Sequence, residues 1–181
     1  MKKTILALAL VAVTGSLFAQ KKTTTSATVA FDASTAIDNL PKAENKTVVA
    51  ALDPKTGSVA FEATVKNFAF ANPTIQQHFN GEKWLDSDKF PSFIFKGNII
   101  DPAKVDFTKD GSYNTNVEGS LSIKGVEQKV KAPATIVVKA GAISATSNFS
   151  IKLTDFGISG APIDAGKVSK EPKVTVSADF K

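Results

Sequence analysis

The only histidine of the chain, His78, is the side chain best suited to acid–base chemistry at neutral pH. Ser87, Ser92, Asp86 and Asp88 follow it within a short stretch, so the residue types of a hydrolytic triad are present. A triad also needs a positioned nucleophile, and no G-x-S-x-G motif or equivalent strained turn occurs. We therefore predict no catalytic residues. We interpret His78 as a structural residue that hydrogen-bonds to the backbone or to a carboxylate, with contact to a ligand head group as the second interpretation and hydrolysis as the third.

The composition excludes most metal centres. The chain has no cysteine and a single histidine, which removes thiolate and multi-histidine sites. Asp86 and Asp88 are spaced like the first two ligands of a calcium loop, but Pro91 and Gly97 stand where that loop needs its glycine and its glutamate. All 22 basic residues are lysines, so bidentate recognition of phosphate or guanine by arginine cannot occur. We predict no metal, no cofactor and no nucleic-acid partner.

Residues 1–19 have the pattern of a signal peptide. The positively charged start Lys2-Lys3 precedes an apolar run over residues 5–13, and the small residue Ala19 suits cleavage by a signal peptidase. The apolar run is shorter than the roughly 20 residues of a membrane-spanning helix. We expect a protein that is exported to the periplasm or secreted, without a membrane span, whose residues 20–181 form one domain.

Alternating apolar and polar residues recur along that domain, which is typical of strands with one buried and one exposed face. In residues 115–124, for example, Val117, Leu121 and Ile123 share one face, and Glu118 lies on the other. The pattern predicts eight strands, at 26–31, 46–52, 58–65, 92–100, 115–124, 128–138, 143–153 and 174–180. Turn residues separate them at Asp53–Gly57, Asp110-Gly111, Lys124-Gly125 and Ala140-Gly141. We expect residues 21–26 to be a frayed end, and the last three long strands to form an antiparallel meander.

One stretch breaks this rhythm and predicts a short helix near residues 73–79. Asn72 is a favourable capping residue, and Pro73 suits the first helical position. Such a helix places Ile75 and Phe79 on one face. Two further irregular segments, 101–113 and 155–171, contain scattered proline and glycine, and we expect them to lie over the ends of the sheet.

Eight amphipathic strands can bury their apolar faces in a sandwich or in a closed barrel. Closure removes the exposed strand edges that promote aggregation. A barrel of about eight strands either holds one small ligand or is filled by its own side chains. The alternation alone does not choose between these arrangements.

Three segments resemble the YceI-like family. Residues 78–97 (HFNGEKWLDSDKFPSFIFKG) resemble its helix, acidic stretch, aromatic-proline pair and phenylalanine-centred strand, and residues 117–126 and 149–158 resemble its later hairpin and its closing F-x-I-x-L-x-D-F-x-I motif. Residues 21–52 depart from the family pattern. The resemblance implies an all-β, eight-stranded antiparallel, lipocalin-like barrel. It also implies an elongated apolar cavity for an isoprenoid or fatty-acyl chain, in an exported protein.

The chain has 13 phenylalanines against one tryptophan and one tyrosine, so an interior built from them carries few polar groups. The residues that we expect to line an apolar cavity are Phe61, Phe68, Phe70, Phe79, Trp84, Phe93, Phe95, Val117, Leu121, Ile123, Phe149 and Ile151. We predict a non-catalytic binding protein for a long-chain lipid or isoprenoid. The alternative is a structural or interaction module with a filled barrel and a protein partner. The volume of the interior distinguishes the two hypotheses, because a ligand site needs a continuous cavity of about 300 Å³ or more. The oligomeric state stays open, with a homodimer as one option.

Overall fold

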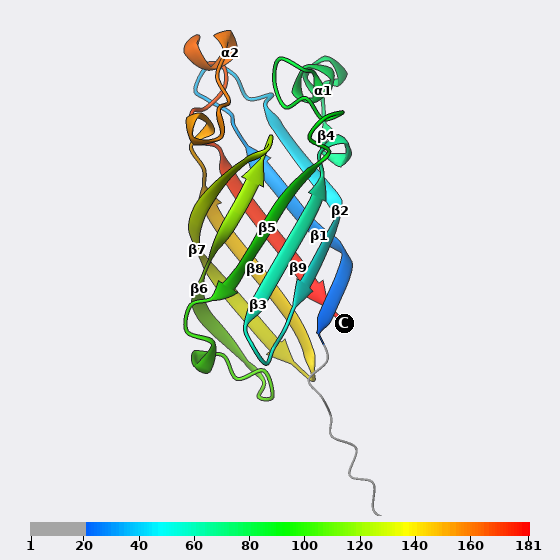
Figure 1. The fold of residues 1–181 in the computed structure, drawn as a ribbon, viewed down its shortest axis with the longest axis vertical. Helices are drawn as coiled ribbons and strands as arrows, with labels where there is room; N and C mark the ends of the chain where they lie inside the picture. The colour runs from blue at the N-terminus through cyan, green and yellow to red at the C-terminus, as the bar shows by residue number, and fades with distance from the viewer. Residues whose placement is uncertain (1–20) are drawn as a thin grey trace, which may run out of the picture.

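Eight long strands form a closed antiparallel barrel in this computed structural model, which describes residues 21–181 (Figure 1). The strands are β1 (Lys22–Asp32), β2 (Lys42–Leu52), β3 (Ser58–Thr64), β5 (Ser92–Ile99), β6 (Gly111–Ile123), β7 (Val126–Lys139), β8 (Ala142–Ser150) and β9 (Lys173–Phe180). They follow the order β1-β9-β8-β7-β6-β5-β3-β2, and pairing of β1 with β2 closes the ring. The predicted lipocalin-like barrel is confirmed. The expected signal peptide, residues 1–19, lies outside the described residues.

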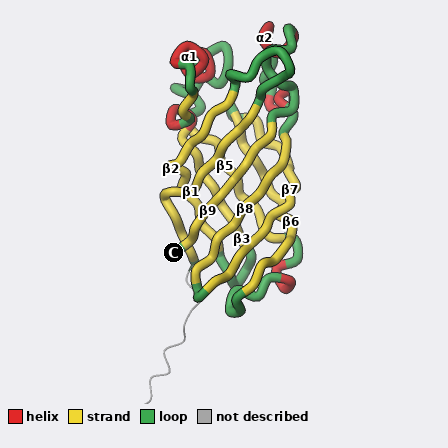
Figure 2. The backbone as a smooth tube through the Cα atoms, turned by 180° about the vertical axis from the view of Figure 1, so that it is seen from behind, coloured by secondary structure: helices red, strands yellow, loops and turns green. Residues whose placement is uncertain are grey.

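A ninth, two-residue strand, β4 (Ala69–Phe70), pairs with the start of β2 and was not predicted. Strand β4 follows the 3₁₀ turn η1 (Val65–Asn67) and pairs only with β2, so it is not a ninth strand of the barrel wall. Viewed from behind, the strands wrap around an interior, and the helical turns lie only at the two ends (Figure 2).

The predicted helix is α1 (Pro73–Asn80). The Asn72 side chain caps it by accepting hydrogen bonds from the backbone N–H groups of Thr74 and Ile75, at 2.9 and 3.4 Å. Phe79 is buried beneath it. A four-residue helix, α2 (Ala161–Asp164), lies within the second irregular segment, together with the 3₁₀ turn η3 (Leu153–Phe156).

The two ends of the barrel differ. One end, which we call the helical end, carries α1, α2 and the β1–β2 connection at residues 33–41 (Figure 1). The opposite end carries the β5–β6 connection at residues 100–110 with the 3₁₀ turn η2 (Pro102–Lys104). The predicted placement of the irregular segments over the ends of the sheet therefore agrees with the structure.

The N-terminal region differs from the prediction. Residues 21–26 are not frayed, because β1 begins at Lys22 and pairs with β2 from Lys22 opposite Leu52 onward. Strand β2 begins at Lys42 rather than at residue 46, and its first inward residues are Ala43 and Asn45. The start of β1 consists mainly of threonines, and the inward residues at the start of β2 are a small residue and an amide. Neither stretch alternates between apolar and polar residues, so the sequence pattern did not indicate strands there.

Two of the predicted hairpin turns are confirmed, and a third predicted turn is not a hairpin. Lys124-Gly125 and Ala140-Gly141 each have positive φ at both residues and form the two-residue hairpins expected of them. Asp110-Gly111 is not a hairpin, because Gly111 is already the first residue of β6. Tyr113, which we expected in an irregular segment, lies in the same strand.

Candidate ligand-binding cavity

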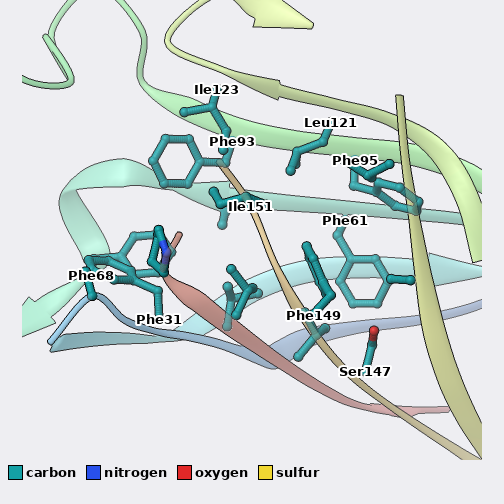
Figure 3. A pocket seen from close by; sticks show the side chains of 18 of the residues that line it. Phe31, Phe61, Phe68, Phe93, Phe95, Leu121, Ile123, Ser147, Phe149 and Ile151 are labelled. Atoms are coloured by element: carbon teal, nitrogen blue, oxygen red, sulfur yellow. The ribbon is translucent and has the colours of Figure 1, made fainter. Parts of the chain in front are cut away.

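The barrel interior is hollow. A cavity of about 360 Å³ runs from the helical end between the strands, and its walls are almost entirely apolar. Phe61, Phe95 and Phe149 point into it, although each stays partly accessible (Figure 3). An inward side chain in a filled core loses nearly all of its accessible surface. The accessible surface of these rings therefore faces the cavity.

The cavity is open because large and small residues are unevenly distributed around the barrel. Strands β3 and β5 contribute phenylalanines to the lining, whereas β7 and β8 contribute the small residues Ala132, Ala134, Ala145 and Ser147. The Ser147 hydroxyl donates to the backbone carbonyl of Pro133, so it adds no free polar group to the cavity. Because this part of the wall carries small side chains, the interior keeps a continuous space.

The structure places every predicted lining residue around this cavity. They are Phe61, Phe68, Phe70, Phe79, Trp84, Phe93, Phe95, Val117, Leu121, Ile123, Phe149 and Ile151. Contact of these residues with a bound ligand stays a prediction. The sequence reasoning missed the lining contributed by β1 and β9, which includes Val29, Phe31 and Val176. The alternation of Val174, Val176 and Phe180 already marked the inward face of the last strand.

An aromatic cluster supports the helical end. Phe31, Phe68, Phe70 and Phe79 come from β1, the η1–β4 segment and α1, and pack with ring centroids 4.8 to 6.0 Å apart. Phe68 also packs against Phe93 of β5 at 5.6 Å. Aromatic pairs at these distances stabilise by about 0.5–1.5 kcal/mol beyond their burial. The cluster therefore anchors α1 to the barrel wall and gives the cavity a fixed rim.

The titratable residues of the cavity lie at its mouth. Asp38, His78 and Lys167 reach the lining from three different segments at the helical end, beside Trp84 and Pro162. The imidazole of His78 is exposed and makes no hydrogen bond to any residue of 21–181, so the predicted structural hydrogen bond is not seen. An exposed ring at the mouth is compatible with contact to a head group.

Three of the other candidate triad residues have side-chain partners elsewhere in the structure. Ser87 is buried, and its hydroxyl donates to the backbone carbonyl of Asn80 at 3.1 Å. Ser92 donates to Glu62 on the barrel surface, and Asp88 pairs with Lys66. Ser87, Ser92 and Asp88 thus each have a partner other than His78.

The mouth loop at residues 33–41 is held by side-chain hydrogen bonds. Asp32 accepts from the backbone N–H and the hydroxyl of Ser34, and its second oxygen lies 3.3 Å from Lys42 Nζ. Partial burial alone would raise the pKa of Asp32, but the hydrogen bonds from Ser34 and the charge of Lys42 outweigh it and lower the pKa.

This arrangement predicts a pH-dependent contribution of Asp32 to stability. A carboxyl whose folded pKa is below its unfolded value stabilises the fold above the unfolded pKa, and the contribution is lost as the pH falls through the folded pKa. The side chain is nearly half exposed, so we expect less than about 1 kcal/mol. The difference in melting temperature between wild type and Asp32→Asn should be largest near neutral pH and vanish in strong acid. A difference that does not change with pH would exclude this role.

Comparison with known proteins agrees with this architecture. The chain matches the YceI-like domain family over residues 13–180. Burkholderia cenocepacia BcnA has a similar fold, with a TM-score of 0.70 at 19% identity over 86% of this chain and 96% of BcnA. A polyisoprenoid-binding domain from Saccharophagus degradans, implicated in plant cell wall breakdown, gives a TM-score of 0.74 at 9% identity over 89% of this chain and 97% of that domain. The YceI protein of Campylobacter jejuni gives 0.54 at 19% identity over 100% and 99% of the two chains. No curated protein matches the chain.

Proposed function

The chain belongs to the YceI-like family, and on that premise we propose that it is a non-catalytic protein that holds the apolar tail of an isoprenoid or fatty-acyl amphiphile inside its barrel. The observation that carries this proposal is the hollow apolar interior. Its volume of about 360 Å³ exceeds the roughly 300 Å³ at which a ligand site begins. The alternative, an interaction module with a filled barrel, requires the side chains to occupy that space.

The energetics favour a ligand with a long tail. Each methylene transferred from water into an apolar site gains about 0.8 kcal/mol. About ten buried groups give roughly 8 kcal/mol before ordering costs, which corresponds to affinity near the micromolar range when the cavity is preformed. The apolar walls offer no partner for a second polar group, so the head group stays at the mouth near Asp38, His78 and Lys167.

The proposal also includes export. A signal peptide over residues 1–19 would place the mature protein in the periplasm or outside the cell, where a long-chain amphiphile needs a carrier or store in water. Within residues 21–181, no helix has the length and apolarity needed to cross a bilayer.

Displacement of a fluorescent long-chain fatty acid from the delipidated protein tests the proposal. We expect one site of roughly micromolar affinity, displaced by a long prenyl alcohol. A short-chain analogue with the same head group should not compete. Because tail burial dominates, His78→Ala should change the dissociation constant by less than about threefold, or roughly 0.7 kcal/mol. A protein that binds none of these probes would contradict the proposal, and a strong loss in His78→Ala would assign the histidine a leading role in binding.

A further inference from the structure

The cavity is closed at the end opposite its mouth. At the helical end its lining includes the exposed residues His78, Pro162 and Lys167. At the opposite end the lining consists of Leu52, Ile99, Ile136 and Phe180, which are only 1–3% exposed. We call these four residues the floor. The floor therefore lacks the solvent-exposed residues that the mouth includes.

Packed side chains lie behind the floor. Val105, Val138 and Ile143 are buried at this end, and Phe107 and Tyr113 pack against the same core. The β5–β6 connection, which we call the cover, carries Val105 and Phe107 and lies at this end of the barrel (Figure 1).

Hydrogen bonds hold this cover in place. The Tyr113 hydroxyl donates to the backbone carbonyl of Lys109 at 2.9 Å. The backbone N–H of Ala140, in the β7–β8 hairpin, donates to Asp110 Oδ1, also at 2.9 Å. The second of these bonds ties the β5–β6 connection to the β7–β8 hairpin. Within residues 21–181, a tail that reaches the floor therefore meets a packed layer rather than an exit.

Phe180 gives the floor a fixed position. Its ring packs edge-on against Phe61, with centroids 6.5 Å apart, and its backbone pairs with Ile143 of β8. A ring held by a neighbouring ring and by a strand cannot easily turn aside to extend the cavity. The floor is therefore a rigid stop at a defined depth below the mouth.

We propose that the floor sets the length of tail that the barrel can bury, so that affinity rises with chain length up to a defined limit and stays constant beyond it. This inference rests on the proposed function. Each methylene added to a tail that has not reached the floor improves affinity about fourfold. Once the tail touches Phe180, further methylenes stay at the mouth in water and add nothing.

A homologous series of saturated fatty acids, delivered from cyclodextrin and measured by displacement of a fluorescent probe, tests this inference. The logarithm of the dissociation constant should fall linearly with chain length and then become constant at a break. Phe180→Leu and Ile136→Val enlarge the space at the floor and should move the break to longer chains. Ala134→Leu adds volume one inward position above Ile136 and should move it to shorter chains.

Phe149→Leu is the matched control, because it makes the same chemical change as Phe180→Leu on the side wall of the cavity. It should change the affinity for tails that reach it and leave the break in place. Ala134→Leu and Ile136→Val keep the test decisive if Phe180→Leu fails to fold. Affinity that keeps rising to the longest chain, or a break that does not move in the folded floor variants, would overturn the inference. Failure of the proposed function is distinct, because no chain length would then bind.

Discussion

Replacing Val176 by Trp should weaken binding of a long-chain amphiphile by more than 100-fold and leave the barrel folded. Val176 lies on β9, faces the cavity and is only partly buried, so a larger ring there enters empty space. If the indole displaces about four methylenes of the tail, roughly 3 kcal/mol of binding free energy is lost, which corresponds to more than 100-fold in Kd. Overpacking of a filled core costs typically 1–3 kcal/mol, whereas filling this space should change the free energy of unfolding by less than about 1 kcal/mol.

Ser177→Trp is the matched control for this variant. Ser177 is the next residue of the same strand, is exposed, and points to the outer face. Its replacement by the same ring should leave the dissociation constant within about twofold of wild type, or roughly 0.4 kcal/mol. Displacement titrations and urea unfolding of both variants give the comparison. Undiminished binding in a folded Val176→Trp protein would show that the tail does not occupy the barrel.

Gly119→Ala should destabilise the barrel by more than about 3 kcal/mol, beyond the usual cost of an overpacked position. Gly119 of β6 lies opposite Gly97 of β5, and a Cβ atom on Gly119 would lie 2.3 Å from the carbonyl oxygen of Lys96 and 2.5 Å from the Cα of Gly97. Both atoms belong to the backbone, so neither can move without separating the two strands. The close approach of β5 and β6 therefore depends on this glycine pair.

The appropriate comparison is a glycine that is restricted only by its backbone conformation. Gly141 has a φ of 80°, and a Cβ atom added to it would have no other atom within 4 Å. Gly141→Ala should therefore lower the free energy of unfolding by only about 1–2 kcal/mol. Urea unfolding of the two variants measures both free energies. A Gly119→Ala protein as stable as Gly141→Ala would show that the strands can separate at this point at little cost.

The strands that alternate strongly in hydropathy could be predicted from the sequence, and so could the helix marked by Asn72 and Pro73. The start of β1 could not be predicted, because Lys22 and the threonines after it acquire their strand conformation from pairing with β2. That pairing forms only when the barrel closes, so no local pattern records it.

The candidate site divides in the same way. The lining phenylalanines could be identified because they fall on the apolar faces of recognisable strands. The mouth residues Asp38 and Lys167 were missed, because they lie in loops that are distant in sequence and meet only at the helical end. Whether the barrel is hollow or filled could not be predicted either, because this depends on how the inward side chains pack together in three dimensions. Alanines at 132, 134 and 145, on strands that line the same interior as the phenylalanines of β3 and β5, were the signal available for it.

Crystals of the protein grown with a fatty acid brominated near the end of its tail provide the most direct test of the central claim. We expect one anomalous peak inside the barrel, close to Phe61 and Phe180, with the carboxylate near the mouth beside His78 and Lys167. A barrel occupied by its own side chains, or bromine found only on the outer surface, would contradict the account.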